Sequence, residues 1–155
     1  MGEPFLHPEM KSIVNLVLNY PHLKELIIET ALYKNITEEI KSLSSIGNNF
    51  QKLSLIVNLT TLNESKYKSI YQNRTSVKSI LDQITLLTDT MPKSNLHVQM
   101  IKMKEVEEEI ESYFTHFEKI GINVILQKYN TFAGLMPEKR VSDLTPIKRD
   151  FCWHL

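Results

Sequence analysis

The sequence is poor in cysteine, glycine and proline, and each shortage excludes a class of structure. A single cysteine in 155 residues, Cys152, allows no internal disulfide, so the chain is not a small secreted domain held together by disulfides. Only four glycines and six prolines occur. Because no Asn-Gly or Asp-Gly pair separates two alternating runs, β-hairpins are not expected. The long stretches without helix breakers predict helices instead.

The chain also lacks an excess of charge of either sign and lacks a long apolar run. Lys plus Arg and Asp plus Glu each number 18, whereas proteins that grip nucleic acid are usually basic. No stretch of 18 apolar residues occurs, as a membrane-spanning helix requires, and the first residues do not resemble a signal peptide. The sequence therefore predicts an intracellular protein, nuclear or cytoplasmic. We expect no transmembrane segment and no nucleic acid as the main ligand.

Motifs typical of enzymes and metal sites are missing as well. There is no Gly-rich phosphate loop, GxSxG turn or pair of Cys-x-x-Cys motifs. The five histidines are scattered, and none lies three or four residues from another histidine or cysteine. The acidic run from Glu105 to Glu111 lacks the glycine turn of a calcium loop, so it is predicted to be a solvated helix face. We expect no catalytic activity, no metal and no cofactor.

Apolar residues recur every seven positions in three parts of the chain. Such spacing is the a and d pattern of a coiled coil. The three stripes are Leu96, Met103, Ile110, Phe117 and Val124; Ile70, Val77, Ile84 and Met91; and Ile36, Leu43, Phe50 and Val57.

These stripes predict an all-α protein, an antiparallel helical bundle or coiled coil. Short connections between long helices make neighbouring helices antiparallel. A compact bundle and an extended coiled coil both fit the pattern. The predicted helical domain covers residues 1–133, with two short helices near 8–20 and 23–32 and three long ones near 37–62, 65–90 and 94–133.

Residues 134–155 differ from the rest and are predicted to form an extended C-terminal tail. This segment has two prolines and no sustained helical period. Phe151, Trp153 and Leu155 alternate, so they lie on one side of an extended strand. They either fold back onto the domain or anchor a partner.

Two short motifs in the tail resemble phosphorylation sites. The segment at Thr145, TPIK, resembles the Ser/Thr-Pro-x-Lys/Arg pattern of cyclin-dependent kinases. The segment at Ser142, KRVS, resembles the basic-x-Ser pattern of Aurora and cyclic-nucleotide-dependent kinases. Arg140 and Arg149 suit two-pronged contacts to a partner's carboxylates. Phosphate on Ser142 or Thr145 would offset these charges and shift the affinity.

The pattern as a whole predicts a non-enzymatic structural subunit of a helical multiprotein assembly, a hetero-oligomer with other helical proteins. Small neutral subunits with heptads and a short tail are common in kinetochore, spindle and tethering assemblies, which suggests by analogy a role in the cell cycle. The alternative is a compact helical adaptor or regulator of viral type, presenting a groove to a partner's helix. The predicted partner-binding residues are Leu96, Met103, Ile110, Phe117, Val124, Arg140, Arg149, Phe151, Trp153 and Leu155.

Overall fold

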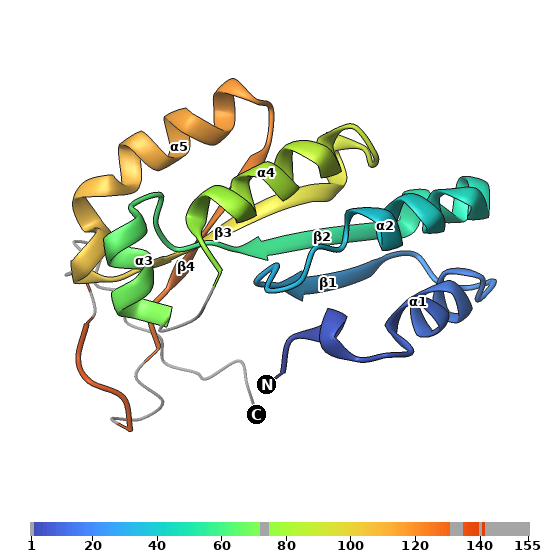
Figure 1. The fold of residues 1–155 in the computed structure, drawn as a ribbon, viewed down its shortest axis with the longest axis horizontal. Coiled ribbons are helices and arrows are strands. Elements are labelled where there is room, and N and C mark those ends of the chain that lie inside the picture. Colours follow the sequence, from blue (N-terminus) through green and yellow to red (C-terminus); the bar gives the residue numbers. More distant parts are fainter. Residues whose placement is uncertain (1, 72–74, 131–134, 140, 142–155) are drawn as a thin grey trace, which may run out of the picture.

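The chain folds around a four-stranded parallel β-sheet with strand order β1-β2-β3-β4 (Figure 1). A computed structural model describes residues 2–71, 75–130, 135–139 and 141. The predicted all-α fold, with its helical bundle or coiled coil, is therefore wrong, and the protein belongs to the α/β class. The strands are β1 (Leu26–Thr30), β2 (Leu53–Asn58), β3 (Leu96–Lys102) and β4 (Asn123–Lys128).

Helical segments precede β1 and join each strand to the next. Since all strands run the same way, each connection must bring the chain back to the amino end of the sheet. Right-handed crossovers between strands in sequential order place these connections on one face of the sheet. The α-helices are α1 (Met10–Leu18), α2 (Thr37–Leu43), α3 (Glu64–Tyr71), α4 (Val77–Thr88) and α5 (Ile110–Lys119). The 3₁₀-helices are η1 (Pro4–Leu6), η2 (Ser44–Lys52), η3 (Lys93–Asn95) and η4 (Lys104–Glu109).

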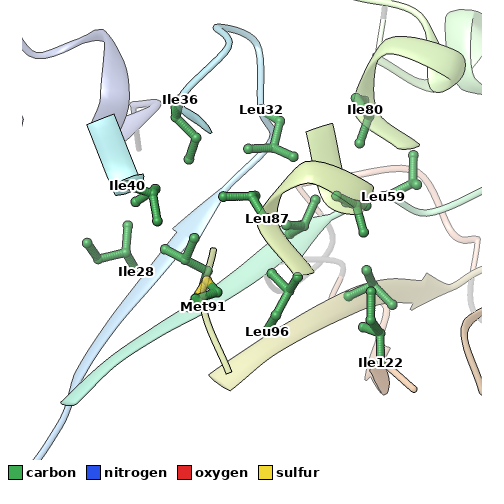
Figure 2. Packing of buried hydrophobic residues seen from close by; sticks show 14 of the residues in the cluster. Ile28, Leu32, Ile36, Ile40, Leu59, Ile80, Leu87, Met91, Leu96 and Ile122 are labelled. Carbon is green, nitrogen blue, oxygen red and sulfur yellow. The ribbon is translucent and has the colours of Figure 1, made fainter. Parts of the chain in front are cut away.

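The hydrophobic core lies between the sheet and these helices. The register pairs Leu55 with Ile28 on one side and with Leu96 on the other, so apolar side chains form rows across the strands. Figure 2 shows Leu87 of α4 packed over this face, close to Leu96. Fully burying one such side chain contributes about 1.5–3 kcal/mol. The core side chains with no exposed surface include Leu32, Ile36, Ile40, Leu53, Leu55, Val57, Leu59, Ile80, Ile84, Leu87, Leu96, Val98, Met100 and Phe117.

The longest predicted helix, residues 94–133, is in fact a strand–helix–strand unit. Leu96 lies in β3, Phe117 in α5 and Val124 in β4, so the seven-residue period runs through three elements. α5 ends because Gly121 adopts a positive φ of 74°. There the Gly121 amide donates to the Glu118 carbonyl and the Ile122 amide to the Phe117 carbonyl, both at 3.0 Å. This pair of bonds is the Schellman motif, which terminates helices.

The other predicted helices are corrected in the same way. The segment 23–32 contains β1, in which Ile28 and Thr30 are buried and Ile27 and Glu29 are exposed. Residues 37–62 contain α2, η2 and β2, and residues 65–90 contain two helices, α3 and α4. Only the first short helix, predicted near 8–20, corresponds to one helix of the structure, α1.

The second face of the sheet has a mixed polar and apolar surface. Except for Ser54 and Gln99, its side chains are exposed or half-exposed, and Ile27 is 55% exposed. All-parallel sheets are usually covered on both faces, so this bare face is an unusual feature. Its residues are Ile27, Glu29, Ser54, Ile56, Asn58, His97, Gln99, Ile101, Asn123, Ile125 and Gln127.

Candidate functional site

The carboxyl ends of the four strands meet at one edge of the sheet. In open α/β sheets, ligands bind in crevices outside this edge. Here the edge is built by the end of β1 and by the segments that follow β1 and β2. It contains the buried polar residues Thr30, Thr60 and Thr61. This edge is therefore the candidate functional site.

A glutamate from the start of the chain closes the carboxyl end of β1. Glu3 Oε1 accepts a 2.5 Å hydrogen bond from the Thr30 hydroxyl, and its Oε2 accepts a 2.7 Å bond from the Ala31 amide. The Thr30 hydroxyl oxygen in turn accepts from the amide of Leu32 at 3.1 Å. Because both carboxylate oxygens are engaged, Glu3 fixes the segment Gly2–Pro4 against the strand end.

A buried glutamine holds the next part of the same connection. Gln83 of α4 accepts from the Ile36 amide at 3.3 Å and donates to the Leu32 carbonyl at 3.2 Å. Leu32 has a positive φ of 52°, a conformation that costs energy in a residue with a side chain. The glutamine and the buried Leu32 side chain together keep this turn in place.

The connection after β2 is fixed by three hydroxyl contacts. The Tyr113 hydroxyl donates to the Leu59 carbonyl at 2.5 Å, and the Thr60 and Tyr71 hydroxyls share a 2.5 Å bond. The Thr61 hydroxyl donates to the Glu109 carboxylate. Burial raises the pKa of both tyrosines, so each stays neutral near pH 7.

Lys66 of α3 links this connection to the acidic run. Its ammonium lies 2.7 Å from carboxylate oxygens of both Glu108 and Glu109, and these bonds raise the pKa of Lys66. The predicted acidic helix face is thus divided between η4 and the start of α5. In the parts of the chain that the structure describes, no three His, Cys, Asp or Glu side chains form a group that could hold a metal ion.

A pocket of about 660 Å³ lies between the Gly2–Pro4 segment and the bare side of β1. This volume is typical of small-molecule sites. The Glu29 carboxylate, the Tyr33 phenol and the Asn58 amide are polar groups of its wall, and Ile27 and Met10 are apolar ones. Asn58 Oδ1 accepts a 2.7 Å bond from the Gln99 side chain, which orients the amide.

Half of the predicted partner-binding residues lie in the part of the chain that the structure describes. Leu96, Met103 and Phe117 are buried in the core of this chain, and Ile110 and Val124 are half-buried. Arg140, Arg149, Phe151, Trp153 and Leu155, and the predicted phosphorylation sites Ser142 and Thr145, lie outside the described residues.

Sequence reasoning missed the residues that build the carboxyl edge. Glu3 and Thr30 are 27 residues apart, so no local pattern joins them. A signal was nevertheless present for β2, because four of its six residues are Leu, Ile or Val. Short apolar segments that alternate with helical ones are typical of βαβ units.

Comparison with other proteins gives a relative but no activity. No family model matches the chain. An uncharacterized protein of Treponema pallidum (strain Nichols) is 29% identical over 163 residues, an alignment that includes 99% of this chain and 45% of the relative. The chain thus spans less than half the length of that relative. Among the described residues, no helix is long and apolar enough to cross a membrane.

Proposed function

We propose that this chain binds a small polar molecule in the pocket between the Gly2–Pro4 segment and the bare face of β1. The observation that supports this function is the pocket of about 660 Å³ that runs along β1, from Leu26 to Ala31, and so reaches the carboxyl edge of the sheet. Parallel sheets bind ligands at this edge because the connecting segments form crevices there. The hydrogen bonds of Glu3 to Thr30 and Ala31 keep one wall of the crevice rigid before any ligand enters.

The polar groups of the pocket favour a ligand with amine or hydroxyl donors. Glu29 offers a carboxylate and Asn58 an amide oxygen that already accepts from Gln99. The half-exposed phenol of Tyr33, 42% exposed, offers a flat apolar surface as well as a hydroxyl. A ligand whose donor faces Glu29 and whose apolar part lies over Ile27 and Tyr33 uses both the polar and the apolar parts of the pocket wall.

This function is tested by ligand-observed NMR with three probe classes: amino acids, nucleosides and monosaccharides. A hydrogen bond to a charged group contributes about 1.5–3 kcal/mol, so Glu29→Gln should weaken binding of the responding class roughly tenfold or more. The matched control is Glu111→Gln on α5, away from the pocket. If no class binds at millimolar concentration, or if Glu29→Gln binds as the wild type does, the proposal is wrong.

A second candidate, the non-enzymatic binding of a partner protein, is favoured by an apolar stripe on α1. Ile13 and Leu16 are three residues apart and share one side of α1, and Tyr20 lies two residues beyond the end of the helix. They are 42%, 76% and 60% exposed. A partner helix could bury this stripe without any coiled coil within the chain. Replacing Leu16 with aspartate should abolish association with such a partner in sedimentation experiments, whereas Glu111→Gln should not.

A further inference from the structure

The outer edge of β4 is bordered by an apolar groove on the helix side of the sheet. β4 is the last strand in the sheet order, and its residues are exposed or half-exposed. Beside it, Phe114 is 38% exposed and Leu126 is 40% exposed. A groove of about 390 Å³ lies at the amino end of the strand, lined by Phe114, Glu118, Gly121, Ile122, Asn123 and Val124. An apolar strand edge of this kind readily pairs with another strand.

Lys139, close to the last described residue, lies near the carboxyl end of β4. The Lys104 amide donates to the Lys139 carbonyl at 3.0 Å, and the Lys139 ammonium lies 2.7 Å from Glu105. Lys104 follows β3 closely, and the end of β3 pairs with the end of β4, Lys102 with Lys128. Residue 139 therefore lies beside the carboxyl ends of both strands.

We propose that residues 150–155 pair with the outer edge of β4 as an antiparallel strand. Phe151, Trp153 and Leu155 then face the helix side of the sheet, and Leu155 lies nearest the groove. A segment that enters at the carboxyl end of β4 must run antiparallel to it. Antiparallel edge strands on otherwise parallel sheets are common.

The length and the pattern of the tail both fit this position. Ten residues from 141 to 151 span up to about 33 Å when extended, whereas the six residues of β4 span about 20 Å. Phe151, Trp153 and Leu155 alternate with Cys152 and His154. In an antiparallel strand with this pattern the three apolar side chains share one face, and the register that we propose turns this face toward Val124 and Leu126.

This proposal has two rivals. The tail could bind the apolar stripe on α1 instead, or another molecule could occupy the edge of β4. The α1 stripe has helical spacing and suits a helix, whereas Phe151, Trp153 and Leu155 have the two-residue period of a strand. A second copy of the chain could instead pair with β4. The experiments below separate these occupants.

The first experiment uses Trp153, the single tryptophan of the chain, in the full-length protein. Its emission should be blue-shifted relative to the urea-unfolded chain, and acrylamide should quench it several-fold less. Phe114→Ser and Leu126→Ser should shift the emission to the red and restore quenching, with circular dichroism confirming that each variant is folded. The matched control is Leu16→Ser on α1, which should leave the emission unchanged. Emission that responds to Leu16→Ser, or to neither groove variant, overturns the proposal.

The second experiment uses Cys152, the single cysteine. Because neighbouring residues of a strand face opposite sides, Cys152 should point away from the Trp153 side, toward Asn123, Ile125 and Gln127. When each of these residues is replaced with cysteine in the full chain, mild oxidation should form an intramolecular disulfide in at least one variant, because the bridge needs Cα atoms about 4.4–6.8 Å apart. A Leu16→Cys control should stay reduced. An intermolecular bridge whose yield rises with protein concentration assigns the edge to a second copy, and no bridge in any variant leaves the edge free; either result overturns the proposal.

Discussion

The hydroxyl of Tyr113 donates a 2.5 Å hydrogen bond to the main-chain carbonyl of Leu59, a residue 54 positions earlier in the chain. Tyr113 belongs to α5, which connects β3 to β4, whereas Leu59 directly follows β2. Both residues are fully buried. The bond therefore ties the last crossover helix to the carboxyl edge of a strand that this helix does not connect.

Removing this hydroxyl should destabilise the fold without removing the ring. In Tyr113→Phe the buried Leu59 carbonyl loses its side-chain donor, and an unsatisfied buried group costs about 1–3 kcal/mol. Urea unfolding followed by circular dichroism measures this loss. The control is Tyr20→Phe, since Tyr20 is 60% exposed and its hydroxyl can bind water in both states. Equal stabilities of the two variants would mean that the Leu59 carbonyl finds another donor.

Gln83 should likewise stabilise the fold, through its hydrogen bonds to the connection after β1. Gln83→Leu keeps most of the volume but leaves the Ile36 amide and the Leu32 carbonyl without their bonds to the glutamine. With two buried groups affected, we expect a loss of about 2–4 kcal/mol in unfolding free energy. The matched change on the exposed end of β4, Gln127→Leu, should alter stability by less than about 0.5 kcal/mol. A similar small effect of Gln83→Leu would show that the turn does not depend on it.

The two-residue alternation typical of a strand is present in the sequence, but the seven-residue spacing of the apolar residues led to a helical prediction. Leu96, Val98 and Met100 alternate with His97, Gln99 and Ile101, which is the period of a strand. Apolar residues in successive strands and helices can happen to lie seven residues, or a multiple of seven, apart. Such residues then look like one stripe of a coiled coil. Periodicity alone does not separate these cases, because it ignores where each element ends.

Asparagine side chains mark the starts of two helices, α2 and α3. Asn35 Oδ1 accepts from the Thr37 amide at the start of α2, and Asn63 Oδ1 accepts from the Ser65 amide at the start of α3, both at 3.0 Å. Asparagine favours such local bonds in turns and caps. The small number of glycines therefore did not imply long unbroken helices.

The candidate site was less predictable than the core. Phe117, a member of the first apolar stripe, is fully buried in the core of this chain, because an apolar side chain is buried in either fold class. The contact of Glu3 with Thr30 and Ala31 depends instead on how α1 returns the chain to β1. Only the three-dimensional arrangement brings these residues together.

Phe117 should be among the most costly core residues to truncate. Its ring is fully buried and packs against Tyr113, with ring centres 4.8 Å apart. Phe117→Ala should lower the unfolding free energy by about 3–5 kcal/mol, measured by urea denaturation. Leu16→Ala, at a site 76% exposed, provides the control and should change stability by less than about 0.5 kcal/mol. A loss below about 1 kcal/mol for Phe117→Ala would contradict its place in a packed core.

Glu64 should make the docking of α4 sensitive to acid. Its carboxylate accepts a 2.8 Å hydrogen bond from the Val77 amide at the first turn of α4, where a negative charge is favoured by the helix dipole. This bond, together with one from Lys68, holds the pKa of Glu64 below its ordinary value.

The pKa of Glu64 is lower in the folded protein than in the unfolded chain, where it is about 4.3. The stability that Glu64 contributes is therefore complete above the unfolded pKa and is lost as the pH falls through the folded pKa. We expect Glu64→Gln to melt at a lower temperature than the wild type at pH 7, and the difference to vanish in acid. Melting followed by circular dichroism between pH 7 and pH 2 checks this. A difference for Glu64→Gln that persists unchanged down to pH 2 would rule out ionisation of Glu64 as its cause.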